Sequence, residues 1–269
     1  MRRLKFKTAI SILFLLFLIA CATVPVTGRK QLNLIPNSEM LSMSFQQYDD
    51  FIKTNKLSTN TNQFNTVKRV GERIKNAVNQ YFQSQGLADN LKDYSWEFNL
   101  VESDQVNAWA MPGGKVVVYT GILPITRDET GLAVVMGHEI AHAVAQHGNE
   151  RMSQLLLTQL GGLALSKALE EQPQLTRDLA LTAYGVGTTV GVLLPYSRTQ
   201  ESEADRLGLI FMAMAGYNPN SAVDFWQRMA AMKGGEAPPE FLSTHPSDQT
   251  RINDIKKHLP EALQYYKGN

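Results

Sequence analysis

Apolar residues recur every three or four positions along most of the chain, which is the period of one face of an α-helix. In the second such stretch, Val67, Val70, Ile74 and Val78 form a continuous stripe. The predicted helices span about 37–53, 61–84, 128–148, 150–171, 201–215, 218–232 and 247–258. The chain is therefore expected to be mostly helical.

The pattern changes between the second and third of these helices. Residues 95–101 alternate like a half-buried strand, and 106–111 and 115–120 have the pattern of two further extended segments. Pro112-Gly113-Gly114 supplies a turn between the last two. The predicted fold class is α+β, with a small β-sheet beside the helix at 128–148.

Leu179–Ser197 is an uncharged run within the helical part of the chain. A transmembrane helix is one interpretation, but the threonines and glycines in the run weaken it. A buried or mobile helical segment that covers the functional site is the favoured interpretation.

The amino terminus has the pattern of a secretory signal peptide. Four basic residues precede an uncharged run, Thr8–Ala20, which is too short to span a bilayer comfortably. The sequence Leu18-Ile19-Ala20-Cys21 resembles the lipobox of bacterial lipoproteins, in which cleavage precedes a cysteine that carries diacylglycerol. We therefore expect a lipoprotein signal peptide at 1–20, lipidation of Cys21 and a tether at 21–36. An uncleaved anchor helix is the alternative.

Composition narrows the classes of partner. Of the 269 residues, 43% are apolar and 19% are charged, which is ordinary for a globular protein. Removal of 1–20 takes away four basic residues and no acidic one, so that 22 basic residues face 25 acidic ones, a net charge of −3. This balance gives no electrostatic footprint for nucleic acid. Cys21 is the single cysteine, so no disulfide is expected within the mature chain.

His138-Glu139-Ile140-Ala141-His142 places an H-E-x-x-H motif in the predicted helix at 128–148. Residues four apart lie on one side of a helix, so His138 and His142 can bind the same metal ion. Glu139 is offset by about 100° around the axis, which suits a carboxylate that contacts metal-bound water. A surface helix with two unrelated histidines is the alternative. The apolar residues before the motif favour a buried helix, where each unpaired polar group would cost about 1–3 kcal/mol.

A second acidic segment lies in the predicted helix at 201–215. Glu201 and Asp205 are four residues apart and share a face, whereas Glu203 points away from it. That face suits a third metal ligand, Glu201, and an acceptor that orients a ligand histidine, Asp205. Taken alone, the segment also fits a solvated acidic patch beside two arginines.

The two motifs together resemble a gluzincin zinc-peptidase family, that of the CAAX prenyl protease and the membrane protease HtpX. The resemblance extends to Asn107-Ala108, Pro112-Gly113-Gly114, Thr120-Gly121, Ser243-Thr244-His245-Pro246-Ser247 and Arg251. With the lipobox and Pro25-Val26-Thr27-Gly28-Arg29, the chain is similar to a periplasmic lipoprotein branch of this family. The β-barrel assembly-enhancing protease is related to that branch, and we expect this chain to lack its tetratricopeptide repeats.

The resemblance implies one Zn2+ per chain, held by His138, His142 and Glu201 in a gluzincin-type core. It gives catalytic roles to Glu139, which would take a proton from the metal-bound water, and to Asp205. The residues that it expects along an extended substrate are Asn107, Ala108, Trp109 and Ala110. These residues would form an edge strand of the sheet, and an ordinary core strand is the alternative.

His245 and Arg251 have several interpretations. His245 precedes a proline in a predicted loop and fits a surface residue. In relatives the equivalent histidine approaches zinc as a fourth ligand and shuts the site, or it would stabilise the oxyanion of the tetrahedral intermediate. Arg251 would support the oxyanion or only cap local structure.

The sequence therefore predicts a single zinc metallopeptidase domain at 37–269. We expect a metalloendopeptidase, lipid-anchored in the periplasm on the outer membrane, that hydrolyses unfolded or misassembled envelope proteins in quality control. The branch also implies contact with outer-membrane assembly machinery. The rival prediction is a non-catalytic chaperone or assembly factor in which zinc, closed off by His245, only braces the fold.

Overall fold

A computed structural model of the chain describes residues 21–24, 27–232, 240–246 and 249–268. The chain forms two compact units. The first consists of Met1–Met40 and Gln146–Tyr196, and the second of Leu41–Ala145 and Ser197–Asn269. The expected signal peptide at 1–20 and the expected loop at 233–239 lie outside the described residues.

The second unit is mainly helical. Its helices are α3 (Thr61–Ser84), α4 (Leu123–Thr126), α5 (Glu129–Val144), α9 (Ser221–Ala231), α10 (Glu240–Thr244) and α11 (Gln249–Leu263), with the short η1 (Ala88–Leu91) and η2 (Thr120–Ile122). Two longer helices, α2 (Asn37–Thr54) and α8 (Leu194–Met214), begin in the first unit and continue into the second. The mostly helical α+β class with a small sheet is confirmed.

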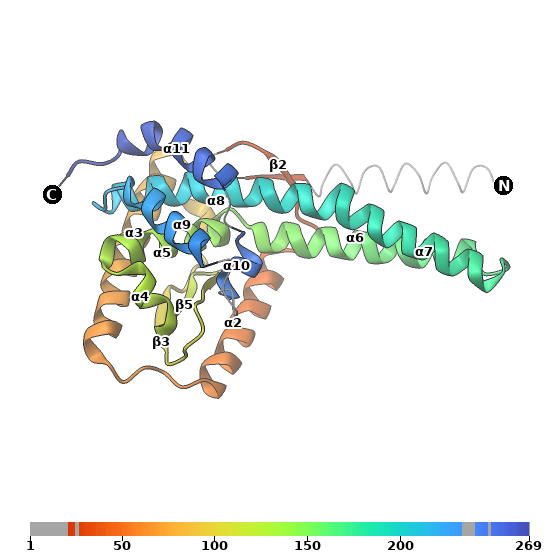
Figure 1. Cartoon of the computed structure of the whole chain (residues 1–269), viewed down its shortest axis with the longest axis horizontal. Helices are drawn as coiled ribbons and strands as arrows, with labels where there is room; N and C mark the ends of the chain where they lie inside the picture. Colours follow the sequence, from red (N-terminus) through yellow and green to blue (C-terminus); the bar gives the residue numbers. More distant parts are fainter. Residues whose placement is uncertain (1–20, 25–26, 233–239, 247–248, 269) are drawn as a thin grey trace. The chain divides into compact units, whose positions relative to one another are not determined.

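The sheet of the second unit has three strands in the order β3-β5-β4. Central β5 (Lys115–Tyr119) pairs in parallel with β3 (Glu97–Val101) and antiparallel with β4 (Ala108–Met111). Every residue of β5 is buried, as expected for a central strand covered on both faces. Helix α5 packs on β4 and β5, while Tyr48 of α2 packs with Val117. The sheet thus lies directly against the helix that carries H-E-x-x-H (Figure 1).

The first unit is built on a helical hairpin. Helices α6 (His147–Ala168) and α7 (Gln174–Thr188) pack side by side, and a π-helical turn, η3 (Thr189–Leu193), follows (Figure 1). Strands β1 (Cys21–Thr23) and β2 (Lys30–Leu32) pair antiparallel, and β2 packs on α6. The segment 21–36, expected as a tether, therefore contains paired strands.

A polar cluster holds the amino-terminal segment to the first turns of α6. Arg29 donates two hydrogen bonds of 2.7 Å to the two carboxylate oxygens of Glu150, which is fully buried. Asn149 donates to the backbone oxygen of Ile35, and Ser153 accepts from the backbone nitrogen of Leu34. Bidentate pairing compensates the burial of the Glu150 charge.

Predicted and observed elements agree closely in some places and differ in others. Helix α3 has the predicted bounds, and its cap is Asn60, whose side chain accepts from the backbone nitrogen of Gln63. Strands β1 and β2 and helix α10 are missing from the prediction because each is too short to show a period. The expected burial of Leu179–Ser197 is wrong for α7, which has no buried residue. Within the described residues, no helix combines the length and apolarity needed to cross a membrane.

Candidate metal centre

The site begins with α5, which is buried at every position from Gly131 to Val144. Its amino terminus is capped by Asp128, whose side chain accepts from the backbone nitrogen of Gly131 at 2.8 Å. An apolar helix buried all round can hold polar side chains only where they find partners. In α5 these side chains are the residues of the H-E-x-x-H motif.

A close crossing of two helices brings the second motif to the first. Gly137 of α5 faces Gly208 of α8, and a Cβ at Gly208 would lie 2.9 Å from the backbone nitrogen of His138. Such a distance leaves no space for a side chain at Gly208. The missing Cβ atoms therefore let α8 approach α5, and the earlier turns of α8 place Glu201 and Asp205 beside His138.

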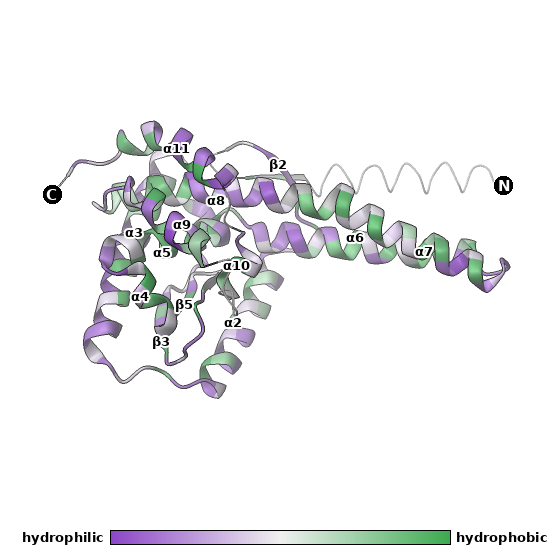
Figure 2. Cartoon of the chain, viewed as in Figure 1, coloured by the Kyte–Doolittle hydropathy of each residue, from purple (hydrophilic) through white to green (hydrophobic). Residues whose placement is uncertain are grey.

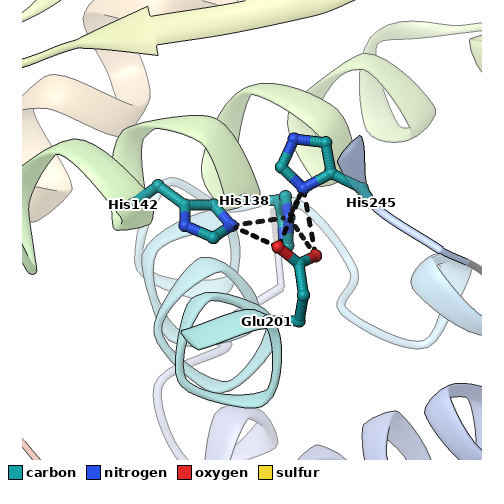
Figure 3. A group of neighbouring side chains, drawn as sticks. All are labelled: His138, His142, Glu201 and His245. Carbon is teal, nitrogen blue, oxygen red and sulfur yellow. Dashed lines mark hydrogen bonds and ion pairs between the residues drawn. The ribbon is translucent and has the colours of Figure 1, made fainter. Parts of the chain in front are cut away.

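Four side chains converge at this crossing (Figure 3). His138 Nε2 lies 3.1 Å from His142 Nε2 and 3.1 Å from His245 Nδ1. Oxygens of Glu201 lie 3.3 Å from His138 Nε2, 3.2 Å from His142 Nε2 and 3.0 Å from His245 Nδ1. All four ligand atoms fall within 4.8 Å of one another.

This spacing fits a bound zinc ion. Ligand atoms about 2.0–2.1 Å from zinc at tetrahedral angles lie about 3.3 Å apart. Two ring nitrogens facing each other at 3.1 Å cannot both be hydrogen-bond acceptors without repulsion, and a cation between them removes that conflict. The structure thus brings His138, His142 and Glu201 together, with His245 as a fourth member.

His245 lies inside the site and not on the surface. Its side chain is buried, and its ring packs against Phe241 with centroids 4.7 Å apart. The surface interpretation of this residue is therefore wrong. The physical reason is α10, which ends one residue earlier and whose Phe241 accepts a hydrogen bond from the His245 backbone nitrogen.

Glu139 is close to the cluster without belonging to it. Its side chain is buried, and Oε1 lies 3.3 Å from His245 Nε2, without a hydrogen-bond partner among the described residues. Burial raises the pKa of Glu139. A buried carboxylate oxygen without a partner is costly, so this position indicates a place for a water molecule or a substrate.

Asp205 and Arg251 support the cluster from behind. Asp205 Oδ1 lies 2.9 Å from His138 Nδ1, and Arg251 donates to both Asp205 oxygens at 2.8 and 2.9 Å. Arg251 also lies 3.1 Å from Glu201. This network holds the His138 ring with Nε2 directed at the other ligand atoms.

The charges of these carboxylates are stabilised by their neighbours. Burial alone would raise the pKa of Glu201, but the charge of His142 and the hydrogen bonds of the three histidines lower it strongly. Burial likewise opposes ionisation of Asp205, and Arg251 and His138 outweigh it to lower the pKa. Both groups are ionised at neutral pH, as a metal ligand and its supporting acceptor must be.

Sequence reasoning missed the aromatic residues around the site. The guanidinium of Arg251 lies over the ring of Trp226, 3.4 Å from its centroid, and the same ring meets His138 edge-on at 5.6 Å. Phe241 stacks on Trp226, with ring centroids 5.8 Å apart. Trp226 and Phe241 look like ordinary core residues in the sequence, so no local signal marks them.

The expected substrate strand is at the edge of the sheet. Strand β4 is the outermost strand in the order β3-β5-β4, and Asn107 precedes it with its side chain accepting from the Ala108 backbone nitrogen. Ala108 is buried, whereas Trp109 and Ala110 are partly exposed. Trp109 packs edge-on against Phe51, with centroids 4.9 Å apart. Two residues before the strand, the Val106 oxygen accepts from the Phe241 backbone nitrogen, so α10 lies next to the start of β4.

Comparison with known protein families matches residues 67–259 to peptidase family M48. The chain is 40% identical over 174 residues to mitochondrial metalloendopeptidase OMA1 of Schizosaccharomyces pombe, covering 64% of this chain and 49% of the relative. It is 31% identical over 268 residues to the OMA1 metalloendopeptidase of Bos taurus, covering 96% and 50%. The beta-barrel assembly-enhancing protease of Escherichia coli is 30% identical over 189 residues, covering 66% and 38%.

The chain thus spans about half the length of the curated relatives named OMA1. The matched region, 67–259, contains the four residues of the converging cluster, His138, His142, Glu201 and His245, and also Glu139 beside it. The narrower expectation of a periplasmic lipoprotein branch stays a prediction. By the extent of the match and by its His/His/Glu/His cluster, the chain belongs to peptidase family M48, a family of zinc-dependent metallopeptidases.

Proposed function

We propose that this chain is a zinc metalloendopeptidase that hydrolyses internal peptide bonds of extended protein segments. One observation carries the proposal: a complete ligand set lies beside Glu139, a buried carboxylate with an unsatisfied oxygen. A purely structural zinc site has no use for such a group. His138, His142 and Glu201 are the proposed ligands, and Asp205 and Arg251 position them.

The proton transfers are assigned to Glu139. When bound, zinc supplies Lewis acidity and lowers the pKa of a coordinated water to about 7. Glu139 takes a proton from the attacking water and delivers it to the nitrogen of the departing amine. The raised pKa of Glu139 brings this carboxylate closer to the working pH, which favours both transfers.

Strand β4 is proposed to bind the substrate backbone. An edge strand has unpaired backbone groups to which an extended peptide can add as a further strand. The residues assigned to substrate contact are Asn107, Ala108, Trp109 and Ala110. Because β4 packs on α5, a peptide on this edge would run beside the helix that carries Glu139.

His245 is proposed to act as a fourth ligand that closes the resting site. The distances of 3.1 Å to His138 Nε2 and 3.0 Å to Glu201 support this role. The hydrogen bond between Phe241 and Val106 ties the same α10 segment to the chain next to the substrate edge. Opening the site would then require α10 to move, after which His245 would be available to stabilise the oxyanion, with Arg251 assisting from its place beside Asp205.

The cellular role is proposed from the sequence alone. Unfolded or misassembled envelope proteins would be the substrates, and Cys21 would anchor the chain in the periplasm, on the outer membrane. One bacterial relative is named as a beta-barrel assembly-enhancing protease, which fits an assembly-related role, whereas the OMA1 relatives carry mitochondrial names. Incorporation of a fatty-acid analogue into the wild type but not into Cys21→Ser would support the anchor, and equal labelling would refute it.

The decisive experiment compares zinc content and casein cleavage in the wild type, Glu139→Gln and His245→Ala. Glu139→Gln should keep stoichiometric zinc and lose cleavage by about 10²–10⁴-fold, because only the proton acceptor is removed. His245→Ala should keep zinc and cleave faster, because three ligands remain and the fourth position opens.

Cleavage retained in Glu139→Gln would refute the mechanism. If neither the wild type nor His245→Ala cleaves casein or unfolded envelope proteins while both hold zinc, the non-catalytic zinc-braced factor becomes the better account. The buried His245 is the observation that favours this second candidate, because it supplies a fourth protein ligand.

A further inference from the structure

The hairpin of α6 and α7, with the turns that follow it, carries most of the exposed large hydrophobic side chains among the described residues. Among the described residues, 13 large hydrophobic side chains are exposed, and 11 of them lie between 152 and 194. The 11 residues are Met152, Leu155, Leu156, Leu157, Leu160, Leu163, Leu175, Leu179, Val186, Val190 and Leu194. Figure 2 shows hydrophobic residues along both helices of the hairpin.

The hairpin has no core of its own. No residue from Leu155 to Thr188 is buried. The seam between the helices is thin: Tyr184 of α7 lies over Gly161 and donates to the backbone oxygen of Thr158. Each helix can bury only the side chains that face the other helix. The apolar side chains on the outer sides of the hairpin therefore need a further partner.

The charge pattern points to lipid. Residues 152–166 and 179–197 contain no charged side chain, and the charges of the hairpin gather at its turn, between 167 and 178. Leu155, Leu156 and Leu157 are consecutive and all exposed, so they spread over about 200° of the α6 surface. A protein partner covers one stripe of a helix, whereas acyl chains can cover such a wide sector.

The proposed membrane attachment at the amino terminus lies in the first unit, which also contains the hairpin. Four basic residues and the uncharged run Thr8–Ala20 precede Cys21, where β1 begins. Strand β1 pairs with β2, β2 packs on α6, and Arg29 is bound to Glu150 in the first turn of α6. Whether 1–20 stays as an anchor or is replaced by lipid on Cys21, the proposed membrane attachment would join the chain at Cys21, next to the base of the hairpin.

We propose that the α6–α7 hairpin is a membrane-contact element. Its two uncharged segments, 152–166 and 179–197, insert into the boundary between the headgroups and the acyl chains of a bilayer. Its charged turn would stay among the headgroups, and no acidic lipid is required because the turn carries both signs of charge. The proposal rests on the membrane attachment of the amino terminus given under the proposed function, and not on the catalytic assignment.

The test uses the full chain with Cys21 kept, because this residue is the proposed lipid anchor, and the labelled wild type measures any emission that arises from the Cys21 thiol itself. Leu160→Cys, Leu163→Cys and Leu179→Cys place an NBD fluorophore on the hairpin, and Leu263→Cys, at an exposed leucine in the second unit, is the matched control. Each protein is reconstituted into phosphatidylcholine vesicles with and without brominated acyl chains. We expect brominated lipid to reduce emission at least twofold at the three hairpin positions and to leave position 263 unchanged.

Vesicle flotation separates the possible failures. If the protein floats with the vesicles but hairpin emission is unaffected by brominated lipid, the attachment stands and the hairpin proposal is overturned. A second possible result is that emission from the hairpin positions shifts to shorter wavelength as the protein-to-lipid ratio rises, while brominated lipid does not quench it. In that case a second copy of the chain covers the hairpin, and the proposal is also overturned. Protein that does not float at all overturns both, while casein cleavage reports separately on the catalytic assignment.

Discussion

The second unit and the α6–α7 hairpin contain similar apolar side chains in very different surroundings. Leu100 on β3 is fully buried between the sheet and its helices, whereas Leu163 on α6 is 67% exposed. Both residues lie in segments predicted from their apolar patterns, Leu100 in the strand at 95–101 and Leu163 in the helix at 150–171. The comparison shows that an apolar pattern predicts contact with other apolar groups. It does not indicate whether the same chain, another protein or a membrane supplies those groups.

The largest expected effect is at Leu100. Leu100→Ala removes a side chain from the middle of the second unit and leaves a cavity that rigid neighbours cannot fill, at a cost of about 3–5 kcal/mol. Urea unfolding followed by tryptophan fluorescence measures this, because Trp96, Trp109 and Trp226 all belong to the second unit. Leu100→Met keeps the volume and should cost under about 1.5 kcal/mol. A loss below 1 kcal/mol in Leu100→Ala would mean that this core is not close-packed.

Within the first unit, the base of the hairpin differs from its length. Arg29→Ala removes two charge-assisted hydrogen bonds from Glu150, which is fully buried, so we expect a local loss of about 2 kcal/mol. Hydrogen exchange should then become faster in β2 and in the first turns of α6. Lys30→Ala, at the next residue, is the control because Lys30 makes its hydrogen bond to Thr23 at the surface. Unchanged exchange in Arg29→Ala would show that the strands, and not this ion pair, hold the segment.

A smaller effect is expected behind the metal ligands. Asp205→Asn weakens the contact that orients His138, so zinc affinity should fall about 10–100-fold while the ligand set remains complete. Competition with a fluorescent zinc chelator measures the affinity. Asp254→Asn changes a partly exposed carboxylate on α11 that pairs with the surface residue Lys257, and it should leave zinc affinity unchanged. Equal affinities of Asp205→Asn and the wild type would show that His138 keeps its orientation without this carboxylate.

Local spacing was enough to predict most of the metal centre. His138, His142 and Glu139 follow from one helical turn, and Glu201 and Asp205 from another, because residues four apart on a helix must lie close together. A single metal ion can be held by residues of both helical turns only if the two turns lie next to each other. What spacing does not state is how they meet, which depends on the Gly137 and Gly208 contact between α5 and α8.

The unpredicted parts depend on contacts between elements far apart in the chain. Trp226 and Phe241 become parts of the site only because α9 and α10 pack beside His138. Helix α10 and the strands β1 and β2 are stabilised by partners and not by a periodic apolar face of their own, so no periodicity reveals them. The same limit explains the error at Leu179–Ser197, where the absence of charge was interpreted as burial within the protein.

The smallest expected effect completes the comparison, because it is the same substitution made on the hairpin. Leu163→Ala should change the free energy of unfolding in detergent solution by less than about 0.5 kcal/mol, since the exposed side chain leaves no cavity and alanine favours the helix. Unfolding followed by circular dichroism at 222 nm, which includes the helices of both units, is the measurement, with Leu100→Ala as the matched buried control. A loss of 2 kcal/mol or more at Leu163 would mean that the hairpin is covered by protein even without a membrane, which would remove the contrast between the two regions.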